Sequence, residues 1–399
     1  MKKWRMRVSA FFIPQNRTKM VLFVEIPIIM PVVFSAICIN ASHAYAQPVN
    51  PYTVATGTSV VIDKNTTVDT DSATINGHLT IDGGTLNETS RNTGQYKIGL
   101  VYVNGTSGDT ATMTVENGGS LIVHPAGNIV AGLDAGQVGT LTVTGAGSNM
   151  SAGFLQAGNS GDGTINILDG ATASVNQTIL ANMSTAVGVL NVSGSGSKLT
   201  TSILYVNGDG NGTVTSSNGG EVDVSTQLIF GSEGVGDGVL TVENGSVLAA
   251  GGNYGLVVDP TAKGSYQFTI DNSTLENIQS NLITYVNIGI ANTATFQTNS
   301  FTTALGGIVY GTGNLNKEGA GTLLMAEDST YTGATTIAQG TLQLGDGSTT
   351  GSIASSSAIH DNGALVVDRS NALTLTQVID GTGSLTQAGT GTTVLSADN

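Results

Sequence analysis

The chain has 399 residues, with 13 Lys and Arg against 28 Asp and Glu, which gives a formal net charge of −15 at pH 7. A single Cys excludes a disulfide framework, and the sparse cations provide no basic stripe for nucleic acid or anionic lipid. Glycine contributes 55 residues, about twice the usual share, without the three-residue period of collagen.

Residues 1–46 have the features of an export leader. A basic segment opens the chain, and an apolar run over residues 20–39 follows it. Ala44 and Ala46 then supply the small side chains at positions −3 and −1 of a signal-peptidase site, and Gln47 is the first residue after the predicted cut. We therefore predict a cleaved signal peptide and an exported chain.

The alternative for this segment is a transmembrane anchor. Glu25, Pro27 and Pro31 interrupt the apolar run, and the cleavage-like site comes directly after it. Both features favour cleavage over anchoring, and no later segment approaches the roughly 18 apolar residues of a spanning helix.

A five-residue pattern recurs along the next part of the chain: Gly or Ala, usually Thr, then two apolar residues separated by a polar one. Its copies begin at Gly77, Ala111, Gly139, Gly163, Gly188, Gly212, Gly238 and Gly264. The last five spacings are 24, 25, 24, 26 and 26 residues. The alternation predicts a short strand in each copy, with its apolar side chains facing inward.

Each unit contains two further apolar positions. The second position is Leu121, Met150, Val175, Leu199, Val222 or Val247. The third lies in a short run such as Ile129-Val130, Phe154-Leu155, Ile179-Leu180, Ile203-Leu204, Leu228-Ile229-Phe230 or Leu256-Val257-Val258. Three short strands separated by Gly, Asn, Asp and Ser turns make one coil of a three-sided tube.

One unit alone has too few apolar side chains to offset the entropy of ordering about 25 residues. Stacked units place like residues above one another, with parallel strands about 4.8 Å apart. We therefore predict an all-β fold, a right-handed parallel β-helix of about 25 residues per coil, over residues 47–310. Disorder is the competing interpretation, but disordered chains lack regular apolar triplets.

The C-terminal part has a denser motif. It reads G-T-G-N-L-N-K-E-G-A-G-T-L-L over residues 311–324, followed by Y-T-G-A-T-T-I over 331–337 and G-T-L-Q-L over 340–344. This resembles the passenger-associated transport repeat of bacterial autotransporters. The motif positions are Gly311, Gly313, Leu315, Lys317, Gly319, Gly321, Thr322, Leu323, Tyr331, Gly333, Thr335, Ile337, Gly340, Thr341 and Leu342.

A second, incomplete copy of the motif covers residues 381–395. It has Gln387 where the first copy has Lys317, and Thr393 where Leu is usual. We assign residues 311–399 to this repeat region.

The resemblance implies an exported passenger that crosses an outer membrane through a C-terminal β-barrel translocator and folds outside the cell. The long basic leader also resembles those of large outer-membrane secretion substrates. After Tyr331 the chain contains no aromatic residue, whereas transmembrane barrels are girdled by aromatics. We therefore expect the barrel to be absent from this chain, which makes the chain a fragment or a truncated product.

Catalytic and metal-binding patterns are weak. His360-Asp361 lies near Ser355–Ser357, which suggests a hydrolase triad, but residues adjacent in sequence rarely adopt triad geometry. A β-helix lyase would need clustered cations and acids, whereas the only Arg residues after the leader are Arg91 and Arg369. We expect no catalytic, cofactor or metal site and no enzymatic activity.

Three functions remain open. The chain is a surface-exposed or secreted adhesin or self-association module whose outward Thr, Asn, Ser and Asp columns bind a host surface molecule or a second copy. Alternatively it is a passive stalk of a larger autotransporter, or a secreted enzyme whose catalytic part lies on a loop or elsewhere.

Overall fold

The computed structural model describes residues 51–88, 100–105, 108–252 and 254–399, and every regular element in these ranges is a β-strand. No helix in the described ranges is long and apolar enough to cross a membrane. The predicted leader and its cleavage residues Ala44, Ala46 and Gln47 lie outside the described residues.

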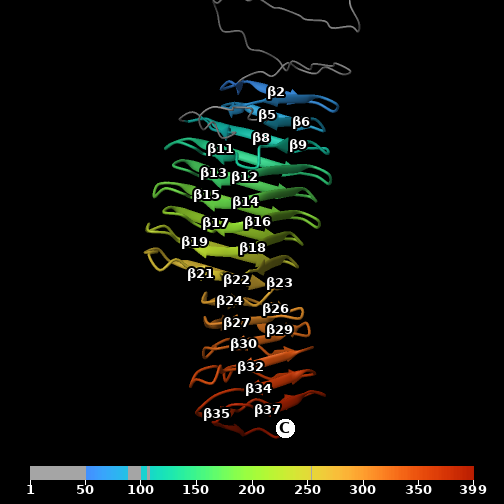
Figure 1. The fold of residues 1–399 in the computed structure, drawn as a ribbon, viewed down its shortest axis with the longest axis vertical. Helices are drawn as coiled ribbons and strands as arrows, with labels where there is room; N and C mark the ends of the chain where they lie inside the picture. The colour runs from blue at the N-terminus through green and yellow to red at the C-terminus, as the bar shows by residue number, and fades with distance from the viewer. Residues whose placement is uncertain (1–50, 89–99, 106–107, 253) are drawn as a thin grey trace, which may run out of the picture. The chain divides into compact units, whose positions relative to one another are not determined.

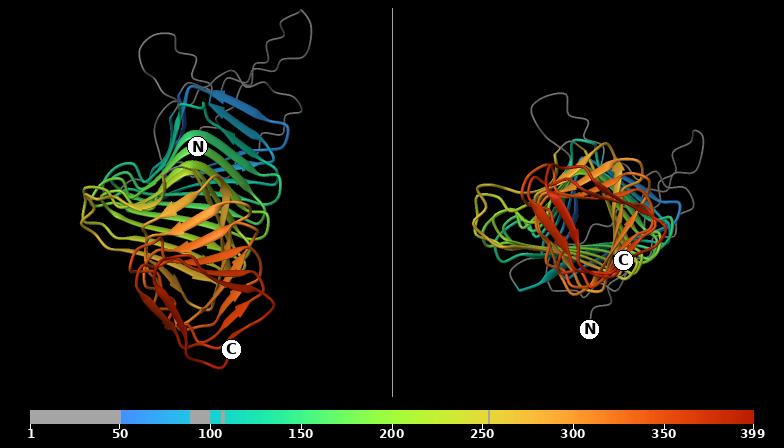
Figure 2. Two further views of the ribbon diagram at one scale, coloured as in Figure 1. Left: turned by 60° about the horizontal axis from the view of Figure 1, so that its bottom comes forward. Right: turned by 90° about the horizontal axis from the view of Figure 1, so that it is seen from below.

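The described strands form a parallel β-helix, as the repeat predicts. Each strand pairs in parallel with its counterparts in the coils before and after it. Figure 1 shows the rungs stacked in sequence order, and Figure 2 shows them winding around a common axis.

One face of the coils is an 11-stranded sheet. Its strands are β2 (Ser59–Ile62), β5 (His78–Asp82), β8 (Thr110–Glu116), β11 (Val138–Thr144), β13 (Asp162–Leu168), β15 (Val187–Ser193), β17 (Asn211–Ser217), β19 (Gly238–Glu243), β22 (Tyr266–Asp271), β25 (Ile288–Ile290) and β28 (Val309–Gly311).

The other two faces share one 25-stranded network, because four long strands bend from one face into the other. These four are β12 (Asn149–Ala157), β14 (Thr172–Leu180), β16 (Lys198–Tyr205) and β18 (Glu221–Phe230). The alternation of buried and exposed residues in β12 shifts phase at Ala152 and Gly153, where the strand turns the corner.

The remaining strands of the two faces are shorter. The second face adds β3 (Thr67–Thr70), β6 (Thr85–Glu88), β9 (Ser120–Ile122), β20 (Val247–Gly251), β23 (Ser273–Gln279), β26 (Thr293–Gln297), β29 (Asn314–Glu318), β31 (Thr335–Ile337), β33 (Ile359–Asp361) and β36 (Ile379–Asp380). The third adds β1 (Tyr52–Val54), β4 (Ser72–Ile75), β7 (Leu100–Val103), β10 (Asn128–Ala131), β21 (Gly255–Val258), β24 (Leu282–Thr284), β27 (Thr302–Leu305), β30 (Thr322–Met325), β32 (Thr341–Leu344), β34 (Ala364–Val367) and β37 (Ser384–Gln387). A separate parallel pair is formed by β35 (Ala372–Leu375) and β38 (Thr392–Leu395).

The coils change length along the stack. Register partners are 24, 25, 24 and 26 residues apart from β11 to β19, as the sequence spacing predicts. From β23 onward they are mostly 19 to 21 apart, with 23 or 24 where the loop after β32 is longer. The stack runs without a break across residue 310, because β26 pairs with β29 and β27 with β30.

The core is a set of columns of like apolar residues. One column of the 11-stranded sheet, buried along its whole length, contains Met113, Leu141, Ile165, Leu190, Val214, Leu240 and Phe268. Each inward side chain therefore lies on its equivalents in the adjacent coils, and burial of this apolar area stabilises the stack.

Two predicted register positions are wrong. The pattern places Gly264 above Gly238, but β22 pairs Tyr266 with Gly238, so this step is 28 residues. The reason is an extra turn at Asp259, whose carboxylate accepts a hydrogen bond from the backbone N–H of Thr261 at 2.8 Å. This turn uses the two additional residues.

The second error lies on the next face. Val247 is a predicted inward position, but it faces outward and Leu248 pairs with Val222 in the core column. Val175 is buried but lies two residues past that column, where Ala173 pairs with Met150.

Asparagine side chains connect coils at one corner. Asn104 Oδ1 accepts the Leu133 N–H at 2.6 Å, and Asn159 Nδ2 donates to the Leu133 carbonyl at 3.0 Å. Asn182 Nδ2 donates to Asn159 Oδ1 at 3.0 Å, and buried Asn207 accepts the Gly231 N–H at 2.8 Å. These bonds satisfy backbone groups that the corner removes from the strand ladders.

Candidate functional site

The transport-repeat motif spans two successive coils. Residues 311–325 supply β29 and β30 of one coil, and residues 331–344 supply β31 and β32 of the next. Because β29 pairs with β31 and β30 with β32, the two halves of the motif lie directly on each other. The motif is therefore a pair of stacked rungs.

Motif glycines mark the points where the coils approach most closely. A Cβ added to Gly333 would lie 2.2 Å from the Gly313 carbonyl oxygen, and one added to Gly321 would lie 1.9 Å from the Phe301 carbonyl oxygen. Gly319 and Gly340 adopt φ of 79° and 71°, a region that favours glycine. Only glycine fits these corners without widening the coil spacing.

Lys317 is the most unusual motif side chain, because it points into the core and is fully buried. It lies between Phe296 and Ile337 in the column of β26, β29 and β31. Its Nζ donates three hydrogen bonds, to the carbonyl oxygens of Glu318 at 2.9 Å, Gly319 at 2.7 Å and Gln339 at 2.9 Å.

These three bonds use all the donors of an ammonium group. They fasten the turn at residues 318–319 to the next coil, while the aliphatic stem fills the column. Burial lowers the pKa of Lys317 to about 8, partly opposed by the charge of Glu318.

The Tyr and Thr of the motif form a buried hydroxyl chain. Tyr331 Oη contacts Thr335 Oγ1 at 2.6 Å, and Thr335 Oγ1 contacts Ser356 Oγ of the following coil at 2.9 Å. Ser356 donates to the Gly333 carbonyl at 2.9 Å. Burial raises the pKa of Tyr331, so the phenol stays neutral. The four-residue spacing of Tyr and Thr is thus the reach of one hydrogen bond.

The other motif residues form the ordinary wall of the coil. Leu315, Leu323, Ile337 and Leu342 are fully buried, whereas Gly311 adopts φ of 112° at the end of β28. Thr322 and Thr341 are partly exposed register partners on β30 and β32.

The second copy places its variant residues differently. Gln387 lies on β37 in the column of Met325, Leu344 and Val367, not in the column of Lys317. Its Nε2 donates to the Gly389 carbonyl at 3.0 Å, the same two-residue reach that Lys317 makes to Gly319.

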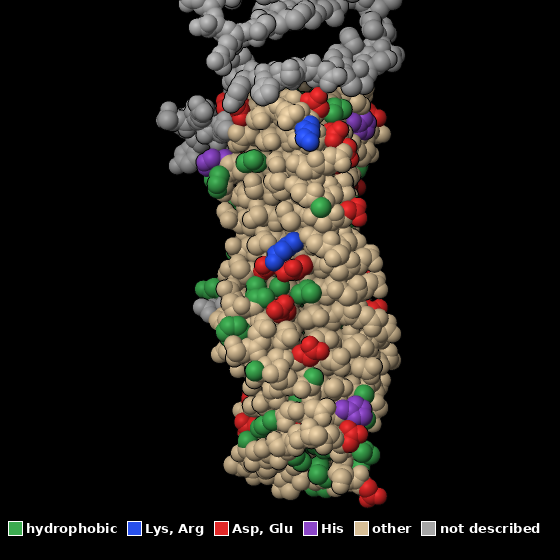
Figure 3. Space-filling model, turned by 90° about the vertical axis from the view of Figure 1, so that its right-hand side faces the viewer, with side chains coloured by type: hydrophobic (Ala, Val, Ile, Leu, Met, Phe, Trp, Pro, Cys, Tyr) green, Lys and Arg blue, Asp and Glu red, His purple; other side chains and the backbone are tan. Residues whose placement is uncertain are grey.

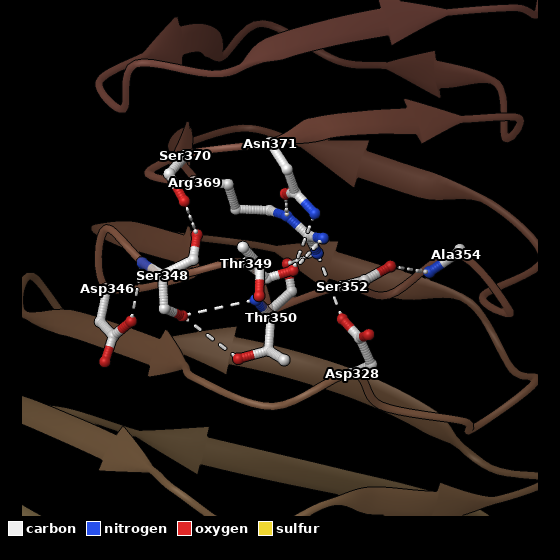
Figure 4. Close-up of polar contacts among 11 residues, drawn as sticks. Asp328, Asp346, Ser348, Thr349, Thr350, Ser352, Ala354, Arg369, Ser370 and Asn371 are labelled. Atoms are coloured by element: carbon white, nitrogen blue, oxygen red, sulfur yellow. Dashed lines mark hydrogen bonds and ion pairs between the residues drawn. The ribbon is translucent and has the colours of Figure 1, made fainter.

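A network around Arg369 holds the longest loop of the C-terminal coils, as Figure 4 shows. The guanidinium is buried and donates to the carbonyls of Thr349 and Gly351, to Asn371 Oδ1 and to Asp328 Oδ1. Asp328 is largely exposed, so most of the stabilisation comes from the bonds to the loop carbonyls. Sequence reasoning missed this role, because an isolated Arg carries no motif.

The suggested triad is not assembled. Ser356 is buried in the hydroxyl chain, and His360 Nδ1 contacts Asp380 Oδ1 at 2.7 Å on the surface. The carboxylate of Asp361 accepts the Gly363 N–H. In the described ranges no group of three or more His, Cys, Asp or Glu side chains is placed to hold a metal ion.

The 11-stranded sheet presents an outward surface that we call the threonine face. Its two central columns run over seven strands from β8 to β22. One column contains Thr112, Thr140, Thr164, Val189, Thr213, Val239 and Gln267, and the other contains Thr114, Thr142, Asn166, Asn191, Thr215, Thr241 and Thr269.

The threonine face contains no charged side chain, although the chain is strongly acidic. Asn191 Nδ2 donates to Asn166 Oδ1 at 2.8 Å, and Asn166 Nδ2 donates to Thr142 Oγ1 at 3.2 Å. The face in Figure 3 is also largely free of charge, and cationic side chains are sparse on it.

Comparisons with known proteins agree with the motif. The family model for the passenger-associated transport repeat matches residues 315–344 and 385–399. Over 57 residues the chain is 54% identical to the adhesin BmaC autotransporter of Brucella suis biovar 1 (strain 1330). That alignment covers 14% of this chain and 2% of the relative, so the chain matches only a small part of the curated protein. The stacked rungs and these matches together identify the chain as an autotransporter passenger that carries passenger-associated transport repeats.

Proposed function

We propose that this passenger acts outside the cell as an adhesin or self-association module, without enzymatic activity. The threonine face is the observation that carries this proposal, since it is an uncharged surface of partly exposed side chains repeated over seven rungs. An extended regular surface suits binding better than catalysis, which needs converging reactive groups. The name of the Brucella relative supports adhesion in the same direction.

The proposal places the chain at the bacterial surface or in the medium, after export by the predicted signal peptide. Its transport partner is an outer-membrane β-barrel translocator. The transport-repeat rungs then serve as a stable C-terminal section of the stack.

The test is adhesion of beads coated with the purified chain. We expect the beads to clump with one another or to bind host cells, whereas albumin-coated beads do neither. Absence of both would contradict the proposal and favour a passive stalk. Hydrolase or lyase turnover by the purified chain would favour an enzyme instead.

A further inference from the structure

The threonine face has a composition that distinguishes it from the rest of the surface. Of its fourteen positions nine are Thr, two are Asn, two are Val and one is Gln. We propose that this face binds the threonine face of a second copy of the chain. The proposal deepens the function proposed above, and rests on it, by naming one partner and one surface.

The first reason is hydrogen-bonding capacity. A Thr hydroxyl and an Asn amide each donate and accept, so two identical faces of this composition can pair. Six of the nine Thr hydroxyls form no side-chain hydrogen bond with another residue in the described ranges: Thr114, Thr140, Thr164, Thr213, Thr215 and Thr241. These groups are available to a facing copy.

The second reason is charge. Two copies of a chain with net charge −15 repel each other wherever acidic surfaces meet. The threonine face is uncharged, and acidic residues lie along its two edges: Asp162 and Asp237 on one side, Glu116, Glu243 and Asp271 on the other. Close contact is therefore least costly in the middle of this face, and salt should strengthen it by screening the rim.

The third reason is size. Seven strands about 4.8 Å apart span about 30 Å, and the seven-residue strands of this sheet are about 23 Å long. The face thus offers about 700 Å² per copy, or about 1,400 Å² in total, which lies within the range of specific interfaces. A surface buried against its own copy gives a closed, isologous dimer.

The experiment is sedimentation velocity of the full chain over a concentration series. We expect a monomer–dimer equilibrium that strengthens between 20 and 150 mM salt, two concentrations chosen to vary screening over about two- to threefold in Debye length. Thr164→Glu combined with Thr213→Glu places two charges in one column, two rungs apart. This variant should dimerise at least tenfold more weakly.

A charge-swap partner keeps the test independent of folding. The variant with Thr164→Lys and Thr213→Lys should also dimerise poorly alone, and an equimolar mixture of the Glu and Lys variants should restore the dimer. Misfolded chains would not be rescued in this way, so failure of rescue would overturn the proposal.

The matched control is Thr295→Glu combined with Thr336→Glu. These residues also lie two rungs apart in one column and are partly exposed, but on the second face. The control should dimerise as the unmodified chain does. An unmodified chain that stays monomeric, or equal weakening by the control, would refute the proposed interface, while the binding of coated beads to host cells judges the broader function separately.

Discussion

Gly333→Ala tests whether the motif glycines set the spacing of the coils. The added Cβ would lie 2.2 Å from the Gly313 carbonyl oxygen and 2.4 Å from the Gly313 carbonyl carbon. An ordinary contact of this kind is about 3.2 Å or longer, so the two rungs must separate by about 1 Å. Both clashing atoms belong to the backbone, and no side chain can move aside.

The separation would disrupt bonds beside Gly333. The Leu315 N–H donates to the Ala334 carbonyl at 2.9 Å, and the Ala334 N–H donates to Asn314 Oδ1 at 2.9 Å. Each lost bond costs about 1 to 3 kcal/mol where the partner stays buried, against a gain below about 1 kcal/mol from the reduced entropy of the unfolded chain. We expect a net loss of about 2 to 4 kcal/mol in the stability of these coils.

Hydrogen exchange measured by mass spectrometry is the assay, because stacked coils need not unfold all at once. Peptides covering β29 to β32 should exchange much faster in Gly333→Ala. The control is Gly245→Ala, where a Cβ meets nothing within 4 Å but φ is 79°, so the cost is about 1 to 2 kcal/mol from the backbone alone. Equal exchange near residue 333 in the variant and the unmodified chain would refute the close-approach argument.

Three further predictions concern buried polar groups. Because burial lowers the pKa of Lys317 from 10.5 to about 8, the unfolded chain binds more protons between these values, and the stability of the coils around Lys317 should rise by about 2 kcal/mol from pH 7 to pH 9.5. Urea titrations should show no such rise in Lys317→Met, and a rise equal in both chains would contradict the assignment. Tyr331→Phe removes one buried hydroxyl and should cost about 1 to 2 kcal/mol by thermal unfolding, whereas Tyr310→Phe, on an exposed ring, should cost almost nothing; similar effects would count against the hydroxyl chain. Arg369→Ala should speed protease cleavage within residues 345–352 several-fold without altering the rungs before Asp328, and unchanged cleavage would show that the loop holds itself.

Much of the fold follows from the sequence because each coil repeats the same inward alternation. The apolar pairs at Leu141 and Val143 and at Ile165 and Ile167 mark both the strand and its buried side. Their regular spacing then fixes which residues become neighbours in the stack.

The register failed where an insertion disturbed the spacing. Gly264 looked like the corner glycine that precedes each strand, but its hypothetical Cβ lies 1.9 Å from the carbonyl oxygen of Gly236, not that of Gly238. A glycine alone does not identify its corner, because several glycines in each turn satisfy the same steric condition.

The polar interior was harder to predict. Lys317 lies two residues after Leu315, so strand alternation places it inward, yet lysine is rarely buried without a carboxylate. The three carbonyl acceptors that allow its burial come partly from a different coil at Gln339. The loop bonds of Arg369 likewise join residues about 20 positions away, and no local pattern signals them.

Disulfide trapping of register partners tests the stacked-coil account most directly. With Cys38 replaced by Ser, cysteines at Thr142 and Asn166 lie in register on adjacent coils, about 4.8 Å apart and within disulfide reach. A pair at Thr142 and Asn191, two coils apart, should stay reduced. The account also predicts a crosslink between Val239 and Gln267 in preference to Val239 and Ser265. Equal crosslinking of adjacent and non-adjacent pairs, or none in the adjacent pair, would contradict it.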